Sequence, residues 1–183
     1  MLSPGALGGL LLAVSIGSIW AASFDVMFEK FEQHNGTEMA NIKLRVRKYN
    51  RTISVLAGNV DLKVVADNTL EVGIRCAYSS KGNSQFNEYP MKIARTKICD
   101  FVNNDWRDYY PYFENSSNLP KVGECPVEPK EFYFNDMVLD ANMFPPYLPH
   151  GLWRLSISIT SPGDDIPMMF YQVYFKVAAV GIF

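Results

Sequence analysis

The chain has little of the chemistry that catalysis or metal binding requires. Its 183 residues include only two histidines, His34 and His150, and three cysteines. It contains no Cys-x-x-Cys unit, no His-Glu-x-x-His, no Gly-x-Ser-x-Gly and no Gly-rich phosphate loop. These absences argue against a zinc site, a metalloprotease, a serine hydrolase and a nucleotide-binding enzyme. The sequence therefore predicts a protein that is not an enzyme and that needs no cofactor and no metal ion.

A surplus of positive charge is also missing. The chain has 17 Lys and Arg against 19 Asp and Glu, for a formal net charge of −2. A nucleic-acid-binding protein would need a basic surface, so that class is excluded. No internal repeat, charge run or low-complexity linker divides the chain. The aromatic content, by contrast, is high at 14% and is spread along the sequence, as a large core or a lined cavity would require.

Charge is absent altogether from residues 1–22. An apolar run followed by small residues is typical of a secretory signal peptide, here cut near Ala22 or Ser23. A basic N-terminal region is lacking, so an uncleaved anchor and a buried N-terminal helix remain alternatives. We expect residues 1–22 to be a signal peptide and residues 23–183 to form one domain. The mature protein would then be secreted, extracellular and not an integral membrane protein.

Two further features agree with export. Three Asn-x-Ser/Thr sequons begin at Asn35, Asn50 and Asn115, and none has proline in its middle position. All three are therefore candidate glycosylation sites. The cysteines, Cys76 and two others, are odd in number. In an oxidising compartment we expect at least one disulfide, with one thiol left over.

Most of the sequence alternates between apolar and polar residues, which indicates half-buried β-strands. A turn-rich segment at Ala66–Thr69 predicts a hairpin between the strands at 60–64 and 70–76. The last strand is apolar on both faces, which a simple sandwich core does not require. Strands at intervals of about 8–12 residues predict a mainly β protein, an antiparallel two-sheet sandwich of immunoglobulin-like type. The expected strands are 42–46, 53–55, 60–64, 70–76, 91–98, 132–138, 153–159 and 168–180.

One segment has a helical period instead. After Cys99, apolar residues at 102, 106, 109, 110 and 113 lie on one face of a helix. Asp100 or Asn103 is the expected N-terminal cap, and Pro111 is expected to end or kink the helix. The sequence thus predicts a sandwich with one short aromatic helix after Cys99.

Several short motifs occur in a recognisable order. Asn50-Arg51-Thr52 precedes a strand, Lys97-Ile98-Cys99-Asp100-Phe101 leads into the aromatic helix, and Glu124-Cys125-Pro126 precedes a strand with Asn135. A Pro-Pro segment and Gly151-Leu152-Trp153-Arg154 follow. From Ile42 to Val177 the chain resembles the ML lipid-recognition superfamily, which includes the ganglioside activator. The most similar branch is that of secreted arthropod proteins that includes the Che-B-type chemosensory proteins.

This resemblance implies a β-cup, whose two sheets splay at one end and admit lipids. It also implies a disulfide between Cys99 and Cys125, which match the two cysteines of the family motif. Relatives often have a cysteine near the mature N-terminus, whereas this chain has none before Cys76. The partner of Cys76 is therefore not predicted, and a disulfide to a second chain remains open.

Two functions follow from the sequence and the resemblance. The first is a secreted carrier of a hydrophobic ligand, such as a fatty acid, a sterol or a cuticular hydrocarbon, with a role in chemosensation. The second is an extracellular interaction module that presents its surface to a cell-surface receptor. For the carrier, the apolar pattern selects a set of large side chains as ligand-binding candidates. They are Trp106, Tyr110, Phe113, Phe134, Phe144, Trp153, Phe170 and Tyr174.

Overall fold

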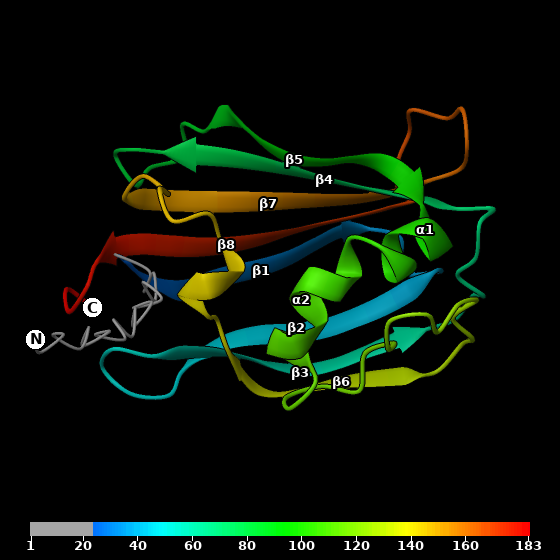
Figure 1. Ribbon diagram of the computed structural model, residues 1–183, viewed down its shortest axis with the longest axis horizontal. Helices are drawn as coiled ribbons and strands as arrows, with labels where there is room; N and C mark the ends of the chain where they lie inside the picture. The colour runs from blue at the N-terminus through cyan, green and yellow to red at the C-terminus, as the bar shows by residue number, and fades with distance from the viewer. Residues whose placement is uncertain (1–23) are drawn as a thin grey trace, which may run out of the picture.

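The protein is a sandwich of two antiparallel β-sheets, seen in a computed structural model that describes residues 24–183 (Figure 1). The larger sheet has five strands in the order β1-β8-β7-β4-β5, and the smaller has three in the order β2-β3-β6. The predicted fold class is confirmed. The expected signal peptide lies outside the described residues. The strands are β1 (Phe24–Asn35), β2 (Ala40–Lys48), β3 (Ser54–Leu62), β4 (Glu71–Ser79), β5 (Asn87–Lys97), β6 (Glu131–Val138), β7 (Gly151–Thr160) and β8 (Met169–Ala179).

The predicted hairpin between residues 60–64 and 70–76 is wrong. β3 pairs with β2 and β6, whereas β4 pairs with β5 and β7 in the other sheet. The chain crosses between the sheets after Leu62, and Ala66 is held midway by two backbone hydrogen bonds of 2.9 Å to Val127. Turn-forming residues mark a change of direction but not the sheet that the chain enters next.

The two strands expected at 53–55 and 60–64 are one continuous strand, β3. Gly58 lies at its centre with a φ of 131°, where the register with β6 shifts. A Cβ atom at this position would lie 2.1 Å from the carbonyl oxygen of Lys43. Glycine is therefore required for close approach of the backbones at a bulge, not for a turn.

Two short helices replace the single predicted one. They are α1 (Ile98–Asn103) and α2 (Trp106–Phe113), followed much later by the 3₁₀ turn η1 (Ala141–Met143). At the C-terminal end of α1, the amide of Asn104 donates to the carbonyls of Asp100 and Phe101. Neither expected cap forms, since Lys97 precedes α1 without a side-chain cap. Pro111 lies inside α2 without ending it.

α1 and α2 lie in front of the opening between the two sheets (Figure 1). They belong to residues 98–130, the segment that leaves the larger sheet at β5 and enters the smaller sheet at β6. We call residues 98–130 the cover. No helix within residues 24–183 is long and apolar enough to cross a membrane.

Two of the three cysteines form the disulfide that the family resemblance implies, and the third is free. Cys99 and Cys125 form a disulfide with a Cα–Cα distance of 5.4 Å, which confirms that prediction. The disulfide joins α1 to the far part of the cover. Cys76 is a free thiol that is only 3% exposed. It lies on β4, between β5 and β7, so it does not lie at a sheet edge.

Candidate functional site

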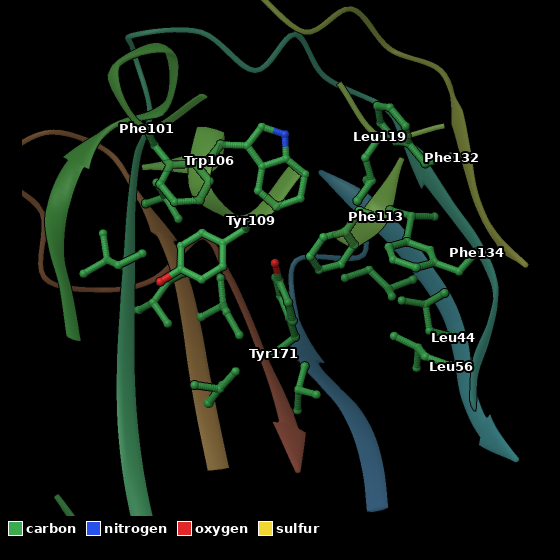
Figure 2. Close-up of a pocket in the computed structure, with 18 of the residues that line it drawn as sticks. Leu44, Leu56, Phe101, Trp106, Tyr109, Phe113, Leu119, Phe132, Phe134 and Tyr171 are labelled. Atoms are coloured by element: carbon green, nitrogen blue, oxygen red, sulfur yellow. The ribbon is translucent and has the colours of Figure 1, made fainter. Parts of the chain in front are cut away.

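A cavity of about 490 Å³ lies between the sheets, beneath the cover (Figure 2). This volume falls in the range of small-molecule sites. All eight strands contribute to its walls, together with both helices, and the cavity is partly open to solvent. Nearly every side chain that lines it is apolar. A space of this kind excludes charged ligands by desolvation and favours apolar ones.

The period-two pattern of the strands produces the cavity floor. On β8 the residues that face inward are Met169, Tyr171, Val173 and Phe175, at alternate positions. β1 adds Phe28 and Phe31, although three positions separate them. The register with β8 shifts between Phe28 and Lys30, and this bulge turns both phenylalanines toward the same face.

The helical face of α2 forms the roof. Trp106, Tyr109 and Phe113 lie three and four positions apart and all line the cavity. The rings of Trp106 and Phe113 have centroids 5.0 Å apart, and Phe113 also meets Phe134 of β6 edge-on at 6.5 Å. Figure 2 shows these rings from α2 and β6 around one side of the space. The roof is therefore aromatic and contacts the smaller sheet.

The cover is held together internally by its disulfide and by a hydrogen bond, and two further hydrogen bonds join it to the rest of the protein. The indole nitrogen of Trp106 donates a 2.8 Å hydrogen bond to the carbonyl of Pro120, so α2 is tied to the loop that follows it. The hydroxyl of Tyr112 donates to the carbonyl of Asn142 in η1 at 3.1 Å. At the start of α1, the amide of Cys99 donates to the side chain of Asn68 at 3.0 Å. These contacts hold the roof in place over the cavity.

Few polar groups reach the cavity wall. Lys92 on β5 is the one charged residue among those that line it, within residues 24–183, and it is exposed. Burial raises the pKa of Tyr171 to about 12. Burial, followed by the charge of Glu88, raises the pKa of the Cys76 thiol to about 11. Tyr171 and Cys76 are therefore neutral at physiological pH, and the thiol is a poor nucleophile.

Four of the eight ligand-binding candidates line the cavity. Trp106 and Phe113 do so from the roof, Phe134 from β6, and Phe144 from the end of η1. Phe144 stacks on Phe175, with ring centroids 4.8 Å apart. The structure thus brings together candidates from three separate parts of the sequence.

The other four candidates lie elsewhere. Tyr110 is not among the lining residues, and its ring meets that of Trp106 in an edge-to-face contact at 6.2 Å. Trp153 is completely buried in the packed core, and its indole nitrogen donates to the carbonyl of Pro149 at 2.9 Å. Large aromatic side chains on an inward strand face fill space as often as they line it, so pattern alone did not separate Trp153 from the cavity residues.

Phe170 and Tyr174 lie on the outer face of β8. Phe170 stacks on His34 with centroids 5.2 Å apart, and the hydroxyl of Tyr174 donates to Gln172 at 2.8 Å. Both positions are one residue out of phase with the inner face. The sequence-based choice missed Tyr171, which shares its face with Phe175 and Val177. The alternation groups these residues on one face but does not show which face of β8 points inward.

The remaining ionisable groups form no obvious centre. Within residues 24–183 no group of three or more His, Cys, Asp or Glu is placed to hold a metal ion. His34 hydrogen-bonds to the side chain of Gln172 at 3.0 Å on the outer face of the larger sheet. The three sequon asparagines, Asn35, Asn50 and Asn115, are all exposed. They are accessible in the folded protein, as glycosylation requires.

Residues 72–155 match the family model described as "Protein of unknown function (DUF1091)". The matched segment runs from β4 into β7 and contains both disulfide cysteines, α1, α2 and β6. The chain is thus similar to this family over the part that forms the roof and one side of the cavity. No curated protein matches the chain significantly.

Proposed function

We propose that the protein is a secreted, non-enzymatic binding protein for a small hydrophobic ligand. The observation that carries this proposal is the cavity of about 490 Å³, whose walls are apolar side chains from both sheets and from the cover. A packed sandwich has no need of such a space, since protein interiors are normally filled to crystal-like density. A bound apolar ligand would fill it.

Binding would depend mainly on burial of apolar surface. Each Å² of apolar surface that leaves water contributes roughly 25 cal/mol, so a long hydrocarbon chain gains affinity along its whole length. Aromatic rings and the flexible side chains of Met91 and Met169 line the space and adapt to different shapes. We therefore expect broad specificity among long-chain lipids.

We further propose membership of the ML lipid-recognition superfamily and a role in chemosensation. The order of the short motifs supports this assignment, as do the two-sheet sandwich and the Cys99–Cys125 disulfide. Secretion and glycosylation belong to the same proposal. They are supported by the uncharged residues 1–22 and by the exposed asparagines of the sequons.

The alternative function, an interaction module for a cell-surface receptor, makes a different structural demand. It requires an exposed apolar surface and no deep cavity. The large apolar side chains that are exposed, such as Tyr147, Ile166 and Ile182, lie at separate places along the chain. The cavity therefore favours the binding protein.

Native mass spectrometry of the protein secreted from eukaryotic cells, followed by extraction and lipid identification, tests the proposal. We expect a co-purifying apolar molecule in near-stoichiometric amount. The variant Val173→Trp fills the cavity from its floor and should be free of ligand. Val138→Trp places the same side chain at a position that is 51% exposed and should retain it.

A ligand-free mass that does not change after incubation with lipid mixtures would contradict the proposal. It would then favour the interaction module. Equal ligand content in the Val173→Trp and Val138→Trp proteins would instead place the ligand outside the cavity.

A further inference from the structure

The polar atoms that reach the cavity are few enough to be considered one at a time. Among the lining residues within 24–183 there is no carboxylate, amide or aliphatic hydroxyl. Side-chain nitrogen and oxygen come only from Trp106, Tyr109, Tyr171 and Lys92 among these residues. The indole nitrogen of Trp106 is already used, because it donates to the carbonyl of Pro120.

Lys92 lies at the periphery of the site, whereas Tyr109 lies in its roof. Lys92 is exposed and belongs to β5, the edge strand of the larger sheet. Tyr109 is half-buried on α2, and burial followed by the charge of Asp108 raises its pKa. Lys92 therefore has access to water and does not need a ligand, and the experiment below separates Tyr109 from Tyr171.

Tyr171 is in a different position. It lies on β8, between β1 and β7 within the larger sheet, and its ring packs against Phe31 with centroids 5.9 Å apart. Figure 2 shows its hydroxyl pointing into the cavity. No hydrogen bond joins that hydroxyl to another residue of the described chain, and burial is the sole cause of its raised pKa. Tyr171 is half-buried, and its neutral hydroxyl faces the cavity without a protein partner, so an oxygen of a bound ligand would give it one.

We infer that Tyr171 supplies the polar contact of the site and selects lipids that carry one uncharged oxygen function, such as an alcohol, ester or ketone. This inference rests on the proposed function. A ligand oxygen placed within the cavity accepts a hydrogen bond from Tyr171, while the remaining chain is buried against apolar walls. A pure hydrocarbon leaves the hydroxyl unpaired.

A carboxylate fits this position poorly. Transfer of an ionised group into apolar surroundings is costly unless a counter-charge is present, and Lys92 is the sole cationic side chain among the described lining residues. Because Lys92 is exposed, a carboxylate paired with it would stay near solvent and leave Tyr171 unsatisfied. Fatty acids are therefore expected to bind less tightly than the matching alcohols.

The experiment compares ligands of one chain length: tetradecane, tetradecanol, methyl tetradecanoate and tetradecanoate. Each competes for the full secreted protein with a fluorescent long-chain probe. The wild type should bind tetradecanol and the ester about tenfold more tightly than tetradecane, the factor expected for one net hydrogen bond. Tyr171→Phe should abolish this preference without weakening the binding of tetradecane.

Tyr174→Phe is the matched control. It removes the same atom from the same strand, but on the outer face, and should leave the preference unchanged. Equal affinity of the wild type for tetradecane and tetradecanol would overturn the inference while leaving the carrier function intact. So would loss of the preference in Tyr109→Phe rather than Tyr171→Phe, or tightest binding of tetradecanoate with its loss in Lys92→Gln. Absence of binding by all four ligands would contradict the proposed function itself.

Discussion

The two ends of the space between the sheets use the same kind of side chain for opposite purposes. At one end Trp153 is completely buried, with the ring of Tyr78 at a centroid distance of 5.1 Å and that of Tyr89 edge-on at 4.6 Å. At the other end Trp106 and Phe113 surround a cavity. Aromatic content is high at both ends, so composition does not decide whether side chains fill a space or line it.

The difference comes from what faces each group of rings. At the packed end, side chains of the two sheets form one continuous cluster, in which Trp153, Phe24 and Val177 of the larger sheet pack with Val46 of the smaller sheet. At the cavity end, the cover intervenes between β5 and β6, and its helices rest across the opening. A helix supported at the sheet edges holds its side chains above the floor, so the space beneath it is not filled.

Removal of one aromatic ring from each end should show the difference between the packed end and the cavity end most clearly. Trp153→Ala should lower the free energy of unfolding by about 4 kcal/mol, because it leaves a void in a filled core. Phe113→Ala should lower it by about 2 kcal/mol, because one side of this ring already faces the cavity. Urea unfolding followed by circular dichroism measures both values.

In ligand binding the order should be reversed, and Phe113→Ala should lose more affinity than Trp153→Ala. Phe113→Ala removes part of the wall, whereas Trp153 has no contact with the cavity. Similar losses of stability in both variants would mean that the rings around the cavity are as tightly packed as the core.

Removal of the disulfide should have the next largest effect. The double variant Cys99→Ser, Cys125→Ser opens a loop of 26 residues, and loop-closure entropy predicts a loss of about 3 kcal/mol. Hydrogen exchange should show the first loss of protection in α1 and α2, with the strands around Trp153 unchanged. Uniform loss across the whole protein would show that the cover and the core unfold as one unit.

High pH should lower the stability of the protein through Tyr171 at the cavity, by a smaller amount than the substitutions above. The pKa of Tyr171 rises from 10 when unfolded to about 12 when folded. Its contribution to stability is complete below pH 10 and is lost as the pH rises toward 12, because the unfolded chain ionises first. The wild type should lose about 2 kcal/mol more than Tyr171→Phe over this range. Identical pH profiles in urea titrations would mean that the hydroxyl is hydrated in the folded protein.

Much of the fold could be predicted from local patterns. Alternation in Trp153, Leu155, Ile157 and Ile159 gave β7, because a strand with one buried face must have a period of two. The disulfide came from the resemblance to a family. β1 was missed because its sequence mixes charged and apolar residues, and a bulge near Phe28 interrupts its alternation.

The site was harder to predict than the fold, for a physical reason. β8 is rich in apolar and aromatic residues on both faces, so its pattern could not show that Tyr171 rather than Tyr174 points inward. That choice depends on where the smaller sheet lies, which is a long-range property. Similarly, Trp153 and Trp106 both looked like lining residues, and only the position of the cover separates them.

The cover has a consequence for how such proteins diversify. Residues 98–130 form one uninterrupted stretch of chain that contains the whole roof and both disulfide cysteines, whereas the floor is distributed over many strands. Substitutions in this stretch can reshape the cavity without changing any strand pairing. We expect evolution to alter ligand preference mainly here, and a graft of this single segment between relatives to transfer that preference.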